Sequence, residues 1–76
     1  MPLTFDLWPN PTSERVFFAF EEQQPDLLEI YDLMGKTIYS GTWLPEFDVS
    51  NLAGGIYFVR ANSGGESVVK RMEVVR

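Results

Sequence analysis

The fold is decided by the stretch IYFVRANSGGESVVKRMEVV, which occupies residues 56–75. Residues 56–61 are mostly β-branched or aromatic, and such side chains fit the pleated surface of a strand. Two glycines follow inside the short polar segment 62–65, which is typical of a tight turn. Residues 66–75 then form a second run. The stretch therefore predicts a β-hairpin whose second arm is the final strand.

Five more runs of the same kind precede this hairpin. In each of them apolar residues recur at every second position, as on a strand with one buried face. Turn residues separate the runs at the spacing of about 8–12 residues that is typical of β-sandwiches and barrels. The expected strands occupy residues 3–8, 15–21, 27–32, 37–43 and 47–49.

Seven strands in 76 residues predict an all-β protein, an immunoglobulin-like two-sheet antiparallel β-sandwich. No stretch keeps a 3.6-residue period, so we expect no helix longer than a single turn. A small open barrel and a single meander are the alternatives. A meander would leave one face of many aromatic side chains in water, which makes it the least favoured of the three.

Single residues are expected to shape the turns between these strands. Gly35 lies in a short hairpin loop, at a position that can adopt positive φ. Gly41 predicts a β-bulge or the end of regular pairing. The side chain of Asp48 or Ser50 can bond backbone amides of the turn that follows the short fifth strand.

The composition excludes most catalytic and metal chemistry. The chain has no cysteine, so it has no disulfide, no thiolate zinc site and no thiol nucleophile. It has no histidine either, so it lacks the commonest general base and the imidazole metal ligand. We therefore expect no enzyme activity and no cofactor. A length of 76 residues allows one domain.

Charge is unevenly distributed along the chain. Residues 1–59 hold nine acidic and two basic side chains, a net charge of -7, and residues 60–76 hold four basic and two acidic ones, a net charge of +2; the two add to the -5 of the whole chain. An acidic body argues against nucleic acid as a partner. No window approaches the roughly 18 apolar residues of a membrane span. The basic end is either a contact surface or the solvated face of the last strand.

Some residue groups allow a chemical interpretation beside a structural one. Residues 48–51 offer carboxylate, hydroxyl and amide oxygens that suit calcium, but hydrogen bonding within the turn is the favoured interpretation. Glu21 and Glu22 would point to opposite faces of a strand, which disfavours a shared catalytic role. A dyad of a serine with Lys70 has no recognisable oxyanion hole beside it.

Aromatic residues leave one functional alternative open. Trp8, Tyr39 and Trp43 can form a platform that stacks on sugars, although in a domain this small the favoured interpretation places them in the core. On the residues alone, the chain is a compact binding or targeting module. The alternative to a targeting role is a β-sandwich carbohydrate-binding or adhesive module that is retained on its parent protein.

Four segments, read in order, carry a family resemblance. They are WPNPTS at residues 8–13, LEIYDLMGK at 28–36, FDVSNLAGGIYFV at 47–59 and VVKRM at 68–72. Their order and spacing resemble the C-terminal sorting domain of the type IX secretion system of Bacteroidetes. That family shows PNP, IYDxxGK, DxSxLxxGxYxV and a closing basic strand. The chain departs from the family at Glu14-Arg15, where a Gly-Lys or similar pair often stands, and in its more acidic charge.

The resemblance implies a non-catalytic signal at the C-terminus of a larger cargo protein. Such a signal directs its parent from the periplasm through the outer-membrane translocon, and a surface sortase then removes it. The cargo is released to the medium or attached to the cell surface. Residues 1–76 would then be a single sorting domain excised from that cargo, with Met1 as a fragment start. The family fold is an immunoglobulin-like sandwich, which agrees with the strand count above.

The resemblance also assigns roles to residues. The positions that match structural motifs of the family are Pro9, Asn10, Pro11, Asp32, Gly35, Lys36, Gly55, Tyr57 and Val59. The last strand and the basic end are expected to be recognised by the secretion machinery, through Val69, Lys70, Arg71, Met72 and Arg76. Because Lys70 and Arg71 point to opposite sides of a strand, at most one of them belongs to a given receptor surface. A weak homodimer through exposed edge strands is also expected.

Overall fold

The computed structural model describes residues 3–20 and 24–76. These residues form seven strands, at β1 (Phe5–Trp8), β2 (Arg15–Phe20), β3 (Leu27–Asp32), β4 (Thr37–Gly41), β5 (Glu46–Asp48), β6 (Gly55–Ser63) and β7 (Glu66–Val74). The all-β prediction is confirmed, since the described part of the chain contains no helix. It accordingly offers no helical segment with the length and hydropathy of a membrane crossing. The pair Glu21 and Glu22 lies outside the described residues.

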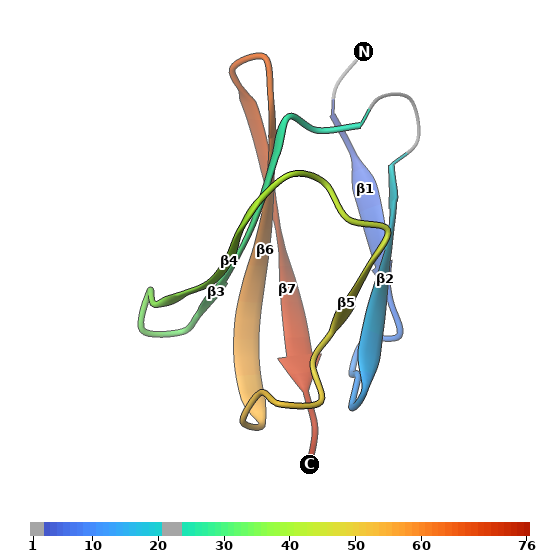
Figure 1. Cartoon of the computed structure of the whole chain (residues 1–76), viewed down its shortest axis with the longest axis vertical. Helices are drawn as coiled ribbons and strands as arrows, with labels where there is room; N and C mark the ends of the chain where they lie inside the picture. The colour runs from blue at the N-terminus through green and yellow to red at the C-terminus, as the bar shows by residue number, and fades with distance from the viewer. Residues whose placement is uncertain (1–2, 21–23) are drawn as a thin grey trace.

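The strands build two antiparallel sheets that face each other (Figure 1). One sheet has three strands in the order β1-β2-β5, and the other has four in the order β4-β3-β6-β7. The predicted two-sheet sandwich is therefore confirmed. The longest pairing joins β6 to β7 over nine residue pairs, from Gly55 opposite Val74 to Ser63 opposite Glu66. This is the hairpin that the stretch 56–75 predicts.

The turn of this hairpin is shorter than expected. Strand β6 runs on to Ser63 rather than ending at residue 61, so that only Gly64 and Gly65 remain between the strands. Their φ angles are 54° and 92°. Two consecutive residues with positive φ give the turn a twist that matches paired strands, and glycine adopts that conformation without strain. The tight turn is what brings all of β7 into register with β6.

Other strand ends differ from the prediction by a few residues. Strand β1 begins at Phe5 rather than at residue 3, although Leu3 is still buried. Strand β4 ends at Gly41, which confirms the predicted end of regular pairing there. The register shift in this sheet lies instead between Ile30 and Tyr31 of β3, so no bulge occurs at Gly41. Gly35 has a φ of 87°, as predicted for its hairpin loop.

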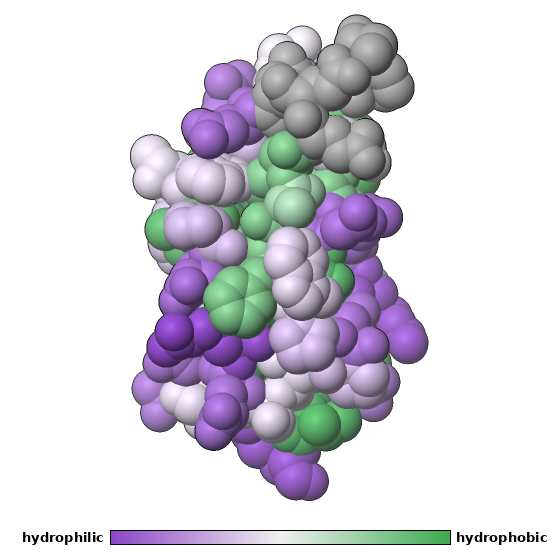
Figure 2. Space-filling model, turned by 90° about the vertical axis from the view of Figure 1, so that its right-hand side faces the viewer, coloured by the Kyte–Doolittle hydropathy of each residue, from purple (hydrophilic) through white to green (hydrophobic). Residues whose placement is uncertain are grey.

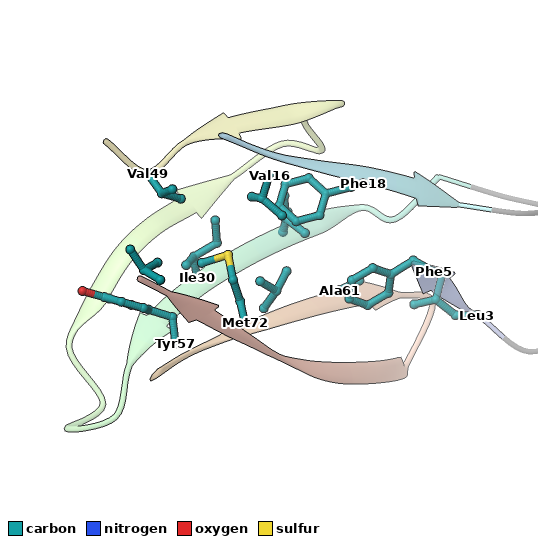
Figure 3. Close-up of a cluster of buried hydrophobic side chains, with 12 residues drawn as sticks. Leu3, Phe5, Val16, Phe18, Ile30, Val49, Tyr57, Ala61 and Met72 are labelled. Carbon is teal, nitrogen blue, oxygen red and sulfur yellow. The ribbon is translucent and has the colours of Figure 1, made fainter. Parts of the chain in front are cut away.

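The hydrophobic core fills the space between the two sheets (Figure 3). It consists of twelve buried side chains, namely Leu3, Phe5, Val16, Phe18, Leu28, Ile30, Val49, Tyr57, Val59, Ala61, Met72 and Val74. Every strand except β4 and β5 contributes to this set, and the partly buried Tyr39 and Phe47 from those two strands pack against it. In β6 the buried residues alternate with partly buried ones, so a single strand serves both the core and the opposite face of its sheet.

The turn after β5 holds the carboxylate of Asp48. One oxygen of this carboxylate, Oδ1, accepts a hydrogen bond from the backbone N–H of Ser50 at 2.8 Å. The favoured interpretation of residues 48–51 as a self-bonded turn is therefore confirmed for Asp48. Hydrogen bonds from the side chain and backbone of Ser50, aided by the charges of Arg15 and Arg76, lower the pKa of Asp48.

The lowered pKa of Asp48 predicts a pH dependence of stability. Because the folded pKa lies below the unfolded value of about 4, the charged form stabilises the fold above that value, and the contribution disappears as the pH falls through the folded pKa. We expect Asp48→Asn to be less stable than the parent chain at neutral pH and equal to it in strong acid. Urea unfolding at several pH values in this range measures the difference in unfolding free energy between the two proteins. A difference that stays constant with pH would contradict the assignment.

Candidate functional site

Strand β7 lies at the edge of the four-stranded sheet and carries most of the residues expected to be recognised. Its side chains alternate between two faces. Met72 and Val74 are buried in the core, whereas Val69 and Arg71 are exposed on the outer face of the sheet. The structure therefore separates the five expected residues into a buried group and an accessible group.

Met72 and Arg76 both make contacts within the domain. Met72 is 0% exposed, so a partner of the folded domain has no direct access to it. Arg76 follows the end of β7 and reaches across to two loops. Its Nε and Nη2 donate to the carbonyl oxygen of Leu52 at 2.9 and 2.8 Å, and its guanidinium also donates to the carbonyls of Ser13 and Val49. Both side chains thus hold the sandwich together around the last strand.

Lys70 lies on the core-facing side of β7, between the inward positions of Val68 and Met72. Its stem is partly buried, and its Nζ lies 5.9 Å from the ring centroid of Phe5 in the opposite sheet. The geometry is that of a cation over an aromatic face at the open side of the sandwich. Lys70 and Arg71 therefore do project from opposite sides of the strand.

The outer face of the four-stranded sheet brings Val69 and Arg71 beside an aromatic group on β3 and β6. Arg71 is the register partner of Phe58, and Val69 is the register partner of Arg60. The rings of Phe58 and Tyr31 are stacked with centroids 5.6 Å apart. The guanidinium carbon of Arg60 lies 5.6 Å from the Tyr31 centroid. We call this group, Tyr31, Phe58, Arg60, Val69 and Arg71, the outer aromatic face.

Sequence reasoning did not bring these five residues together. The alternation in residues 27–32 places Tyr31 on the side opposite Leu28 and Ile30, but the apolar run 56–59 does not show whether Phe58 leaves the core. Neither pattern shows that the two rings are neighbours. Their contact depends on the register of β3 with β6, in which Tyr31 lies opposite Phe58. A cross-strand pair of aromatic residues is a known source of sheet stability, so the outer aromatic face serves the fold as well as any partner.

Polar contacts order the margin of this face. Glu29 Oε1 accepts a hydrogen bond from Asn62 Nδ2 at 3.2 Å and lies 3.7 Å from Arg60 Nη1. A shallow hollow of about 250 Å³ lies beside these groups, lined by Glu29, Tyr31, Gly35, Thr37 and Arg60. The Arg60 guanidinium therefore lies between a carboxylate and an aromatic ring.

The PNP segment, Pro9-Asn10-Pro11, lies against the free edge of β7. The side chain of Asn10 mimics a neighbouring strand, since its Nδ2 donates to the Arg71 carbonyl and its Oδ1 accepts from the Glu73 N–H, both at 2.9 Å. Thr12 continues the contact through its backbone, which bonds Glu73 O and Val75 N at 2.9 Å each. The segment thus covers the C-terminal half of an edge that would otherwise be exposed.

Asp32 organises the hairpin loop between β3 and β4. Its Oδ1 accepts hydrogen bonds from the backbone N–H of Met34 at 2.9 Å and of Lys36 at 2.8 Å. The backbone of Asp32 also bonds Lys36 O and Gly35 N. A carboxylate that satisfies loop amides in this way, next to a glycine with positive φ, explains why an IYDxxGK motif forms a compact turn. The Lys36 side chain is exposed.

The remaining motif residues lie where β6 begins. Gly55 has a φ of 154°, a backbone angle that residues with a Cβ atom rarely adopt. Tyr57 is buried in the core, and its hydroxyl donates to the Ala53 carbonyl at 2.7 Å, which ties the preceding turn to the strand. Val59 is fully buried. The GxYxV motif therefore supplies one backbone conformation and two core side chains.

Trp8 does not lie in the core, so the favoured interpretation was wrong for this residue. It follows Phe5 and Leu7, which face inward, and so lies on the outer side of the three-stranded sheet, where it is 48% exposed and stacks on Phe17. Trp43 instead lies edge-on to Phe20, which faces the other side of the same sheet.

Tyr39 is half-buried against Phe47, with ring centroids 5.7 Å apart. The three aromatic residues that we considered as a sugar platform therefore do not form one. Figure 2 looks at the side of the molecule where β1, β2 and β5 lie. It shows pale and hydrophobic surface along the middle, with hydrophilic surface on both sides.

Comparison with known families finds a match for the chain. The family model of the secretion system C-terminal sorting domain matches residues 6–75, nearly the whole chain. The chain belongs to this family. A search of curated proteins finds no match. The sorting domain is a C-terminal signal for type IX secretion, and its presence implies export to the cell surface or the extracellular space. The resemblance that the four sequence segments carry is thereby confirmed.

Proposed function

We propose that residues 1–76 are a non-catalytic sorting unit, carried at the C-terminal end of a larger cargo protein and recognised as a folded domain. The cargo passes through the periplasm, and the folded unit engages the outer-membrane translocon of the type IX system. A surface sortase then separates the unit from its cargo, which is attached to the surface or released. Membership of the sorting-domain family over residues 6–75 supports this proposal.

The observation that carries the proposal is the position of the basic motif on β7. Val69 and Arg71 are exposed on the outer aromatic face, beside Phe58 and Arg60. Arginine and aromatic residues are the types that most often dominate binding energy at protein interfaces. We assign direct recognition to Val69 and Arg71 on this face, and to Lys70 on the opposite side of the strand. Met72 and Arg76 then contribute by holding β7 in place, through the core and through the loop carbonyls.

Attachment of residues 1–76 to a reporter tests the proposal. A folded reporter with an N-terminal signal peptide is placed before the domain and expressed in a bacterium that has the type IX system. We expect most of the reporter to reach the cell surface or the medium, with the domain cleaved, because the domain supplies the sorting signal. The same reporter without the domain is the control and stays in the periplasm. A periplasmic, uncleaved fusion would overturn the proposal.

A double variant in the same fusion separates recognition from folding. Lys70→Ala with Arg71→Ala removes two charges at exposed or partly exposed positions, so the fold is expected to persist. Export is expected to fall several-fold, whereas the thermal unfolding of the purified domain changes little. Export at the wild-type level would show that neither side chain is recognised by the secretion machinery.

Weak self-pairing through edge strands stays a prediction, and the sedimentation of the purified domain measures it.

A further inference from the structure

The edge of β7 is covered over only half its length. The PNP segment and Thr12 bond the backbone of Arg71, Glu73 and Val75 on the side away from β6. In an antiparallel pair the residues whose backbone groups point to one neighbour alternate with those that point to the other. By this alternation the N–H and C=O groups of Ser67 and Val69 also point away from β6, toward the free edge.

Nothing in the described part of the chain bonds these four backbone groups. Hydrogen bonds between backbone groups outside the strands reach Glu73 and Val75 but not Ser67 or Val69. The side chains do not cover them either, since Ser67 is exposed and Val69 is 46% exposed. A row of unpaired backbone groups at the edge of a sheet is a template for another strand.

The covered half shows what kind of ligand this edge accepts. Thr12 forms a parallel bridge with Val74 through its backbone, and Asn10 bonds the same edge through its side chain. The edge is therefore already hydrogen-bonded by a neighbouring segment along half its length, and outward-pointing backbone groups continue toward residue 66. The PNP segment also limits the length of an added strand, because a strand that lies beside Ser67 and Val69 would meet Asn10 where Asn10 bonds Arg71. About five residues of added strand fit, at roughly 3.3 Å per residue.

Charge indicates which strand would bind there. Lys70 and Arg71 carry positive charge at the inner and outer sides of the open edge, whereas the carboxylate of Glu66 is already bonded to the N–H of Leu3 at 2.9 Å. A second copy of the chain would bring the same two cations to the contact. A strand with acidic side chains complements them, and Val69 offers an apolar contact on the outer face beside Arg71.

We propose that the open half of the β7 edge is a β-strand addition site for a short, acidic, extended segment of a partner protein. This inference rests on the proposed sorting function and places the partner in the secretion machinery. Main-chain hydrogen bonds to Ser67 and Val69 supply affinity, and the flanking cations select the partner. The outer aromatic face then lies directly beside the added strand.

Proline at position 69 tests the backbone contact. Val69→Pro deletes only an N–H that points away from β6, and edge strands tolerate proline at such positions. Val69→Thr is the matched control, because it keeps the N–H and the β-branched shape and changes only the apolar contact of the side chain. In the reporter fusion we expect Val69→Pro to lose most of its export, well beyond any loss in Val69→Thr, with thermal unfolding showing that both variants fold. Ser67→Pro removes the other outward N–H and replaces Val69→Pro if that variant is unfolded.

A second measurement needs no variant. Amide hydrogen exchange at Val69 is followed in the purified domain, with and without detergent-solubilised outer membranes from a type IX-competent bacterium. We expect exchange at Val69 and Ser67 to slow by at least about tenfold, equivalent to about 1.4 kcal/mol, and only with membranes that contain the secretion system. Unchanged exchange at these two amides would overturn the proposal.

The outcomes distinguish this inference from the function on which it rests. A folded Val69→Pro fusion that is exported like the wild type overturns the strand-addition site, while wild-type export still supports the sorting function. A wild-type fusion that remains periplasmic overturns the sorting function itself. A dimer of the purified domain that Val69→Pro abolishes would identify a second copy as the occupant and overturn the assignment to a partner protein.

Discussion

Met72→Ala is expected to lower the free energy of unfolding of the domain by about 2–5 kcal/mol. Met72 is 0% exposed and lies opposite Tyr57 in the β6–β7 pairing, so alanine leaves a cavity between the sheets. The whole stability of a domain of 76 residues is about 4–11 kcal/mol, at about 0.05–0.15 kcal/mol per residue. One truncation therefore removes a large part of it. Urea unfolding monitored by tryptophan fluorescence measures the loss.

Met72→Leu is the matched control for this experiment. It nearly conserves volume and is expected to cost less than about 1.5 kcal/mol. If Met72 acts only through the core, the leucine variant keeps reporter export and the alanine variant loses it in proportion to its instability. A stable leucine variant that fails to be exported would instead show that the thioether itself is recognised. An alanine variant of unchanged stability would contradict the burial of Met72.

Much of the fold is encoded locally and so could be predicted. Alternation of apolar and polar residues over two or three residue pairs is enough to show a strand and its buried face. In β6, however, all four residues 56–59 are apolar, so the period of two pairs Tyr57 with Val59 and Ile56 with Phe58 but does not show that Tyr57 and Val59 are the buried pair. The turn glycines are equally local signals, because the conformation they allow depends on the residue itself. This is why all seven strands could be placed, with errors of a few residues at their ends.

The contacts that define the candidate site are not local. Asn10 bonds Arg71 and Glu73, which are 61 and 63 residues away, and no periodicity in the chain encodes that contact. Lys70 could be placed on one side of its strand from sequence, but its position over Phe5 depends on how the two sheets face each other. The exposure of Trp8 was missed for a different reason. Its burial was predicted from its aromatic side chain, although its place in the alternation of β1 puts it on the side opposite Phe5 and Leu7.

Arg76 shows most clearly how a residue chosen for recognition can act through the fold, and its removal is the second large effect that we expect. Arg76→Gln takes away a guanidinium that bonds the carbonyls of Ser13, Val49 and Leu52. Those bonds join the end of β7 to loops that flank the other sheet. Because the side chain is exposed and water can replace part of the loss, we expect a destabilisation of about 1–2 kcal/mol, measured by urea unfolding.

Arg76→Lys provides the control that decides between structure and recognition. Lysine keeps the positive charge but lacks the planar fork that reaches several carbonyls at once. If Arg76 acts through the fold, the lysine variant recovers little of the lost stability, and export of both variants follows their stability. If the machinery instead reads charge at this position, lysine restores export while the stability of the domain stays low. The second outcome would return Arg76 to the recognition surface, because a charge that supports export without supporting the fold must be sensed by a partner.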